Sequence, residues 1–376
     1  MRLPRAEPYG SALAMTQTTM STTDTITINR ILNTVAERKA TDIHFVVGNY
    51  PFLRIKGSLV PMEGEQLITP EVMRGIMNFF VSEEKKKILD VTKDLKYIFD
   101  WLGKVRFRVH LFQQKGQYSL SLKMIEGRVA SLADLALPKI VADMLDSNQG
   151  LIFITGPFNS GRSTTVAAMI QHINQTRSEH ILYLGEPVEH LFVNDKSIIE
   201  QREVGVDVPT FAQGLASAKD EDVNIVVTAK LPDKESLEQA LELSESGRLV
   251  IGILDYYSAV TALDGLVSEF TDAKVLWARN VLADFLVGVI VQRLVRAVDG
   301  EMTLAVEVLT NSPSGKALIK EGRFAQLESI IQTSKAEGMI SLERSLVELV
   351  NRGKIKPEEA INNAVDPKSM KMLLRR

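Results

Sequence analysis

The sequence predicts an α/β protein in which an α+β N-terminal domain precedes a phosphate-binding domain with a parallel sheet and a helical C-terminal end. Three observations lead to this fold class. Before Leu135, short runs alternate apolar and polar residues, as the strands of an antiparallel sheet do. After Leu135, short apolar runs are separated by helical stretches, which is typical of buried parallel strands. The first of these runs is followed by the motif GPFNSGRST, residues 156–164.

Length and composition indicate a globular protein. The 376 residues are enough for two domains, and 45% hydrophobic with 24% charged residues is ordinary for this class. The net charge of −3 lacks the basic balance of nucleic-acid-binding proteins, so no nucleic-acid partner is expected. The absence of cysteine excludes disulfides, thiolate zinc sites and cysteine nucleophiles. No apolar run approaches the roughly 18 residues of a membrane span.

The N-terminal part predicts a tail and a mixed domain. Residues 1–24 are expected to form a disordered tail, because they are rich in Ser and Thr and lack the apolar centre of a secretory signal. The N-terminal domain is expected over residues 25–126. Apolar residues at helical spacing predict a helix over 28–38 and one or two helices over 71–89 that break near Ser82. Short β-rich runs predict five strands, over 43–47, 52–55, 97–101, 105–112 and 118–125.

The remainder of the chain predicts a parallel α/β domain followed by helices. A linker over residues 127–134 is expected to lead into this domain, which spans 135–310. Helices are expected over most of 311–376. The parallel strands are predicted over 152–154, 181–184, 225–228 and 249–254.

The motif at residues 156–164 is similar to the P-loop, G-x-x-x-x-G-K-[ST], whose backbone N–H groups hold phosphate at a helix start. Ser163 supplies the hydroxyl that binds Mg²⁺ in such loops. Arg162 stands where the motif has lysine, and these two cations are not interchangeable at a tight phosphate site. An ordinary strand–turn–helix is the alternative from the motif alone. The expected nucleotide-binding residues are Gly156, Asn159, Ser160, Gly161, Arg162, Ser163 and Thr164.

Further segments carry a resemblance to one family. Residues 40–44 (ATDIH), 105–109 (VRFRV) and 201–205 (QREVG) match its segments ASDLH, xRFRV and QREVG. Residues 243–249 and 292–295 echo its AAETGHL and QxLV. In this order and spacing, residues 26–374 resemble the PilT/PilU ATPases that drive type IV pilus retraction and twitching motility, within the secretion ATPase superfamily. The PilU branch is followed most closely at 305–309, 318–320 and 337–339.

The resemblance implies an architecture, a cofactor and partners. The N-terminal domain is expected to be PAS-like and the second domain RecA-like, with six subunits in a ring and ATP or ADP in the cleft. Arg106 and Arg108 are implied to reach the nucleotide phosphates; surface salt bridges are their alternative role. The implied partners are further copies or an active PilT-like subunit, and the inner-membrane platform protein of the pilus. The implied location is cytoplasmic, peripheral to the inner membrane at the pilus base.

The departures from the family fall on its chemical residues. Its acidic box IEDPIE reads LGEPVE here, which places Gly185 at the position of the catalytic base and leaves Glu186 and Glu189 as candidate substitutes. Its Walker B segment GEMRD reads AKLPD, so that Lys230 replaces a carboxylate. Its histidine box TLHT reads ILDY, so that Asp255 replaces the histidine.

These changes predict that hydrolysis is lost or strongly impaired, because a positioned general base alone contributes roughly 10²–10⁴-fold to the rate. ATP or ADP binding remains expected, with Mg²⁺ doubtful. A competing hypothesis is that Lys230 and Asp255 form an ion pair where the family places a carboxylate and a histidine, and that this pair fills the empty site. The sequence thus predicts an accessory or pseudo-ATPase ring component. The alternatives are an active retraction ATPase that uses substitute residues and a scaffold that binds no nucleotide.

Overall fold

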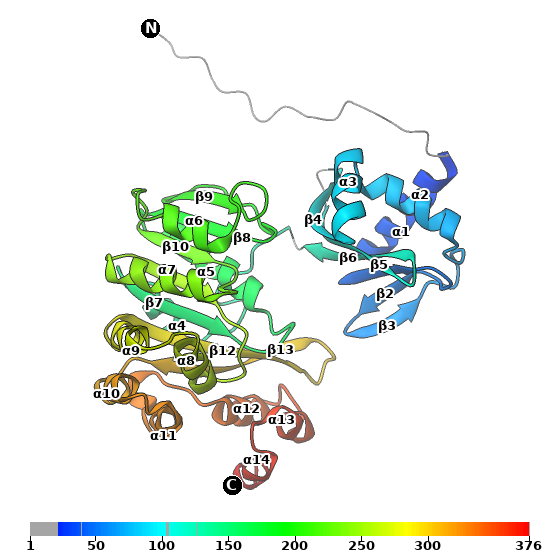
Figure 1. Ribbon diagram of the computed structural model, residues 1–376. Coiled ribbons are helices and arrows are strands. Elements are labelled where there is room, and N and C mark those ends of the chain that lie inside the picture. Colours follow the sequence, from blue (N-terminus) through cyan, green and yellow to red (C-terminus); the bar gives the residue numbers. More distant parts are fainter. Residues whose placement is uncertain (1–21, 39, 103–104, 126, 376) are drawn as a thin grey trace. The chain divides into compact units, whose positions relative to one another are not determined.

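The computed structural model describes residues 22–38, 40–102, 105–125 and 127–375, and the chain divides into two compact units, Met1–Met124 and Ile125–Arg376 (Figure 1). Most of the expected disordered tail lies outside the described residues. Its last three residues are helical, because α1 (Thr22–Glu37) begins at Thr22 rather than near residue 28. No described helix has the length and apolar character needed to cross a membrane.

The first unit holds a six-stranded sheet in the order β3-β2-β1-β6-β5-β4. The predicted antiparallel pairing is confirmed, with Ile43 opposite Leu53 and Leu122, and Phe99 opposite Phe107. The short exposed strand β3 was not predicted, because Ser58 and Pro61 break its β-rich pattern. The strands are β1 (Asp42–Val46), β2 (Phe52–Ile55), β3 (Ser58–Pro61), β4 (Asp94–Trp101), β5 (Val105–Gln114) and β6 (Gln117–Ile125).

Three helices bury one face of this sheet. They are α1, α2 (Pro70–Phe80) and α3 (Glu83–Thr92). The predicted break at Ser82 is confirmed: this residue caps α3, and its hydroxyl accepts from the Lys85 N–H. Leu32, Met73 and Leu89 from the helices pack in one core with Phe45 and Phe107 from the strands.

The second unit is built on a seven-stranded sheet in the order β13-β12-β7-β11-β10-β8-β9. The strands predicted over 152–154, 181–184, 225–228 and 249–254 are confirmed as parallel β7, β8, β10 and β11. β9 and β12 extend the parallel part, and β13 adds an antiparallel edge. The strands are β7 (Gly150–Thr155), β8 (His180–Gly185), β9 (Ile198–Glu203), β10 (Ile225–Thr228), β11 (Leu249–Ile253), β12 (Leu286–Arg296) and β13 (Met302–Thr310).

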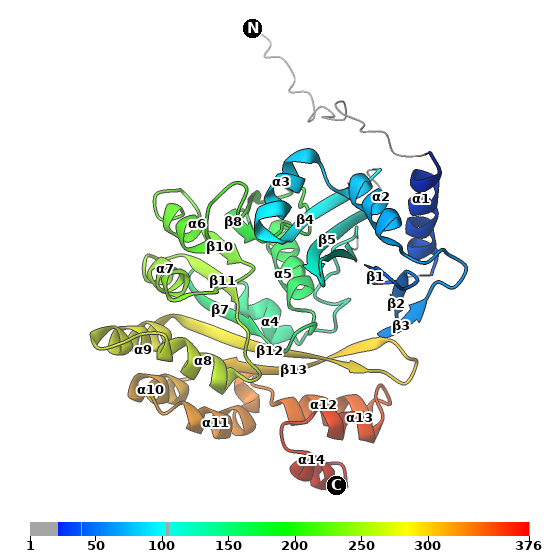
Figure 2. The same cartoon turned by 45° about the vertical axis from the view of Figure 1, so that its right-hand side comes forward.

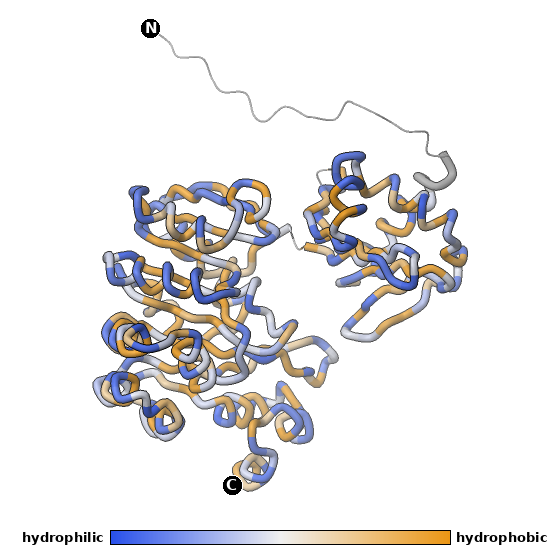
Figure 3. Tube along the Cα trace, in the orientation of Figure 1, coloured by the Kyte–Doolittle hydropathy of each residue, from blue (hydrophilic) through white to orange (hydrophobic). Residues whose placement is uncertain are grey.

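Helices cover both faces of this sheet (Figure 2). Along β7, Ile152 and Ile154 pack against α4 (Lys139–Met144) and α5 (Arg162–Thr176). Leu151 and Phe153 alternate with them and join the core of the opposite face. Since both faces are buried, the strands are continuously apolar, and these are the orange segments that Figure 3 shows within the unit. The helices of that opposite face are α6 (Phe211–Ser217), α7 (Lys234–Glu245), α8 (Ala259–Ser268) and α9 (Ala273–Phe285).

The C-terminal region is helical, as predicted. Ile319 of α10 and Ile331 of α11 join the core below α8 and α9. Leu346 and Met370 pack with Val295 of β12 in a separate cluster. The helices are α10 (Pro313–Glu321), α11 (Leu327–Thr333), α12 (Leu342–Asn351), α13 (Pro357–Asn363) and α14 (Pro367–Leu373), with 3₁₀ turns at Phe324–Gln326 and Lys335–Glu337.

Candidate nucleotide site

The predicted phosphate loop connects the carboxyl end of β7 to the amino end of α5. Gly156 has φ +146°, and a Cβ there would lie 2.3 Å from the backbone oxygen of Gln292 in β12. Only glycine therefore fits where the loop passes over β12. Gly161, with φ +87°, precedes the first helical residue, Arg162. The loop thus has the strand–turn–helix context in which backbone N–H groups hold an anion.

The other loop residues differ in exposure. Asn159 adopts a left-handed conformation with φ +61°, which asparagine tolerates better than most residues. Ser160 is buried, and within the described chain its Oγ has no hydrogen-bond partner. Ser163 and Thr164 are exposed in the first turn of α5. The loop thus offers a close-packed glycine, an unsatisfied buried hydroxyl and two exposed hydroxyls, which fit a phosphate ligand.

Arg162 is already paired inside the protein. Its Nη1 donates to the backbone oxygen of Leu254 at 2.5 Å and to the carboxylate of Asp255. The arginine side chain is only 14% exposed, whereas that of Asp255 is 83% exposed. The guanidinium group of Arg162 is therefore held at the carboxyl end of β11.

A second ion pair lies further along the same edge of the sheet. Lys230 Nζ is 2.7 Å from Glu186 Oε2, and the two side chains are about half exposed. Lys230 follows β10 and Glu186 follows β8, which are neighbouring parallel strands. The hydroxyl of Thr228 donates to the Lys230 backbone oxygen at 2.7 Å and fixes the turn that presents the ammonium group.

The predicted pair between Lys230 and Asp255 is therefore wrong. Strand order allows either pairing, because β11 lies between β7 and β10. Arg162 also donates to the backbone oxygen of Leu254, which holds its guanidinium group beside Asp255, and Lys230 pairs with Glu186 instead. Along the strands β7, β11, β10 and β8 the charges alternate as Arg162, Asp255, Lys230 and Glu186. We call these four side chains the charge row, and as two ion pairs they compensate one another.

The position of the expected catalytic base is crowded. Gly185 is buried at the end of β8, and a Cβ there would lie 3.1 Å from Cα and Cγ2 of Val188. Any residue with a carboxylate side chain would require the neighbouring turn to move. Glu189, the other candidate substitute, is partly buried in the segment after β8. The N–H of Val188 donates to Glu203 Oε2 at 3.0 Å, so this segment is tied to β9.

Arg106 and Arg108 lie in the first unit, on β5. Both are partly buried and lie on one face of the strand, alternating with the buried Phe107. Arg106 stands opposite Asp100 of β4, and Arg108 stands opposite Ile98. They share a strand face, and their proposed contact with a nucleotide remains a prediction.

Several polar residues around the loop were not foreseen. The Thr155 hydroxyl accepts from the N–H of Tyr256 and donates to its backbone oxygen, both at 2.8 Å. Gln292 Nε2 donates to the Thr165 hydroxyl at 2.7 Å in the interior. Thr155 and Gln292 each interrupt an apolar stretch of the sequence, and this interruption is the signal by which they could have been identified. Together they fix the loop to β11 and β12.

Glu307 is a further unforeseen residue. Its carboxylate, inside the apolar run AVEVL of β13, accepts from the Ala259 N–H at 2.8 Å at the start of α8. Burial raises the pKa of this carboxyl to about 7. Because α8 follows the loop that carries Asp255, Glu307 helps to fix that loop.

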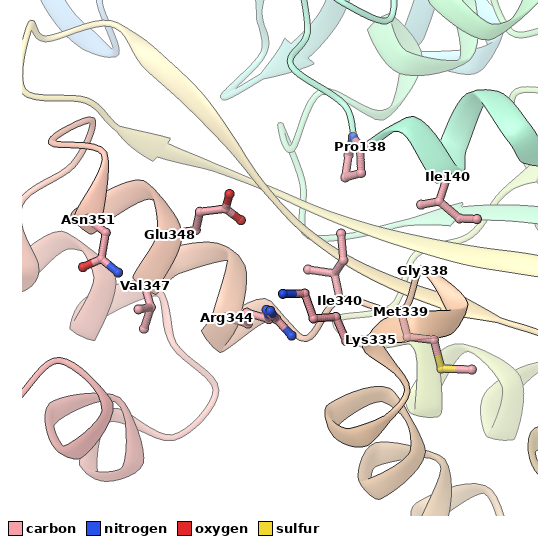
Figure 4. Close-up of a pocket in the computed structure, with 10 residues that line it drawn as sticks. All are labelled: Pro138, Ile140, Lys335, Gly338, Met339, Ile340, Arg344, Val347, Glu348 and Asn351. Atoms are coloured by element: carbon pink, nitrogen blue, oxygen red, sulfur yellow. The ribbon is translucent and has the colours of Figure 1, made fainter. Parts of the chain in front are cut away.

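One cavity of the second unit lies away from the phosphate loop. It measures about 570 Å³ and runs along α12 beside the segment 335–340 (Figure 4). Ile140 and Val347 are among its apolar lining residues, and Lys335 and Arg344 are cations at its side. In the described chain no cluster of three or more His, Cys, Asp or Glu residues could hold a metal ion. The carboxyl edge of the sheet therefore remains the candidate site.

Known proteins are similar to this chain in sequence. The family of type II/IV secretion system proteins matches residues 103–371. The type IV pilus retraction ATPase PilT of Pseudomonas aeruginosa is 32% identical over 91% of this chain and 99% of its own length. The type IV pilus ATPase PilU of the same organism is 26% identical over 92% and 91%. Whole-chain identity is thus higher to this PilT than to this PilU, although the C-terminal segments had indicated the PilU branch.

A solved structure gives the same result for the fold. The crystal structure of the pilus retraction motor PilT with bound ADP superposes with a TM-score of 0.82 at 32% identity, covering 92% of this chain and 99% of that chain. The predicted fold class is confirmed by this similarity and by the sheets described above. The chain therefore belongs to the PilT/PilU family of type IV pilus retraction ATPases.

Proposed function

We propose that this protein is an accessory subunit of a pilus retraction motor, with a nucleotide site in which hydrolysis is lost or strongly impaired. The observation that supports this most is the charge row. Residues at the ends of four adjacent strands pair with one another, as Arg162 with Asp255 and Lys230 with Glu186. A site for phosphoryl transfer needs its charges directed at phosphate, metal and water instead.

Nucleotide binding is part of the proposal. PilT, the related protein of known structure, was crystallised with ADP. In this chain the loop from Gly156 to Gly161 would hold the phosphates, Arg162 would supply the cation, and Ser163 would face a Mg²⁺ ion. Bound ATP would supply the phosphoanhydride bond whose cleavage drives motors of this family. Arg106 and Arg108 are proposed as further phosphate partners.

Impaired hydrolysis is expected from Gly185 and from the residues of the charge row. Gly185 carries no side chain to activate water, and Lys230 brings an ammonium group where the family has a carboxylate. The Glu186 carboxylate is paired with that ammonium group at 2.7 Å and is not directed at a water molecule. Loss of a positioned base reduces the rate roughly 10²–10⁴-fold.

The proposed setting follows from the family. The protein would join a hexameric ring, by itself or mixed with an active PilT-like subunit. That ring would contact the platform protein of the pilus on the cytoplasmic side of the inner membrane. The accessory role explains why the fold is kept while residues that act on ATP are replaced.

Steady-state phosphate release with ATP and Mg²⁺ tests this function, beside the Arg162→Ala variant and a family ATPase as reference. We expect turnover at least about 10²-fold below the reference. Turnover near the reference that disappears in Arg162→Ala and in Glu186→Gln would overturn the proposal and favour an active ATPase with substitute residues. A chain without turnover and without nucleotide affinity in any variant would favour the scaffold.

A further inference from the structure

The pairing of Arg162 leads to an inference about what controls nucleotide affinity. A carboxylate and a phosphate are the same kind of acceptor for a guanidinium group, since both offer paired anionic oxygens. Nη1 of Arg162 already donates to Asp255 and to the backbone oxygen of Leu254. An incoming phosphate therefore has to displace the carboxylate or share the arginine with it.

Asp255 is held beside the loop by its neighbours on both sides. The Leu254 N–H donates to the Ile154 backbone oxygen at 2.9 Å. The Tyr256 backbone bonds twice to the Thr155 hydroxyl, both at 2.8 Å. The carboxylate is thus pre-positioned by β7, and it loses little conformational freedom when it binds the arginine.

The segment that follows is fixed as well. Ser258 and Thr261 form a capping box at the start of α8. The Ala259 N–H donates to the buried Glu307 at 2.8 Å. The loop from Leu254 to Ala259 is therefore bonded to β7, β13 and its own helix, and Asp255 cannot leave the phosphate loop by a swing of that segment alone.

We propose that Asp255 is an internal competitor of the nucleotide phosphate, so that this residue sets the affinity of the site for nucleoside diphosphates. Two effects act together. The carboxylate occupies Arg162, and its negative charge repels the phosphates that approach the loop. The inference rests on the proposed function only in that a nucleotide is the ligand; it requires no statement about hydrolysis.

The test is the affinity for methylanthraniloyl-ADP, measured by fluorescence anisotropy with the full chain in EDTA and again with Mg²⁺. The Asp255→Asn variant keeps the shape of the side chain and removes its charge. We expect it to bind about two- to fivefold more tightly, which corresponds to the upper part of the range measured for exposed ion pairs. The gain should shrink at high salt, because exposed charges are screened.

A matched control removes the same charge nearby. Asp264 is exposed on α8, and Asp264→Asn changes the net charge equally without touching the loop. We expect its affinity to equal that of the parent. The Arg162→Ala background completes a double-mutant cycle: Asp255→Asn should then keep only the part of its gain that comes from charge repulsion, because the carboxylate has no cation left to occupy.

Three results would overturn the inference and leave the proposed function untouched. They are an unchanged affinity in Asp255→Asn, an equal gain in Asp264→Asn, and a full gain that persists without Arg162. A fourth result, failure of binding in the parent and in Asp255→Asn alike, would overturn the inference together with the nucleotide binding of the proposed function. Impaired hydrolysis is tested separately by phosphate release. Equal melting temperatures of the variants show that the fold is intact.

Discussion

At the scale of single residues, Glu307 makes stability depend on pH. Burial raises the pKa of its carboxyl from the ordinary 4.5 to about 7 in the folded protein. The folded state therefore holds this proton more tightly than the unfolded state. The stabilisation is complete below about pH 4.5 and is lost as the pH rises through about 7. Above that range the protein contains a buried charged carboxylate.

Glu307→Gln removes the charge and keeps an oxygen that accepts from the Ala259 N–H. We expect the free energy of unfolding of the variant to exceed that of the parent by an amount that grows as the pH rises. This difference should reach about 2–3 kcal/mol at about pH 8. Urea unfolding across this pH range measures the difference. Glu358→Gln, at an exposed position, should show no such trend. A constant difference between Glu307→Gln and the parent at every pH would contradict the expected titration.

At the scale of elements, the phosphate loop depends on close contact with β12. A Cβ at Gly156 would lie 2.3 Å from the Gln292 backbone oxygen, whereas one at Gly205 would meet nothing within 4 Å. Both glycines have positive φ, at +146° and +87°. Gly205→Ala should cost about 1 kcal/mol from backbone strain alone. Gly156→Ala should cost about 3 kcal/mol, because steric overlap with β12 adds to that strain.

Urea unfolding compares the two glycine variants, and methylanthraniloyl-ADP binding reports the loop. We expect binding to be lost only in Gly156→Ala. Equal losses of stability in the two variants would show that contact with β12 does not shape the loop.

Much of the fold was predictable from sequence because local patterns determine it. The break at Ser82 was found because serine caps a helix there, and the four central strands because burial on both faces makes them apolar. β9 was missed, since an edge strand that reads IIEQRE carries polar residues on its open side. β12 and β13 were not assigned, although Asp299-Gly300 between their two apolar runs is a signal for the turn of a β-hairpin.

The sequence predicted which residues belong to the candidate site, and it did not predict which of them form ion pairs. The loop residues and the replaced positions Gly185, Lys230 and Asp255 could be read along the chain. Which strands are neighbours is a property of the whole domain, and even that order leaves Asp255 between Arg162 and Lys230. The pairing with Arg162 depends on side-chain geometry, since the same Nη1 also donates to the Leu254 backbone oxygen.

At the scale of the whole molecule, each described hydrophobic cluster is drawn from one unit alone. One core cluster is drawn entirely from the first unit and includes Phe107. Phe153 belongs to a cluster drawn entirely from the second unit. Units with cores of their own are expected to unfold separately. The chain contains two tryptophans, and each unit holds one, Trp101 and Trp277.

These tryptophans allow each unit to be followed alone. Trp277→Phe leaves the buried Trp101 as the reporter of the first unit, and Trp101→Phe leaves Trp277 for the second. Phe107→Ala, at a residue 1% exposed, should cost about 3–5 kcal/mol and lower only the urea midpoint seen by Trp101. Phe153→Ala is the matched change in the other core and should lower only the midpoint seen by Trp277. If either variant moves both midpoints equally, the units unfold as one cooperative structure, and changes in the first unit would then alter the stability of the nucleotide site.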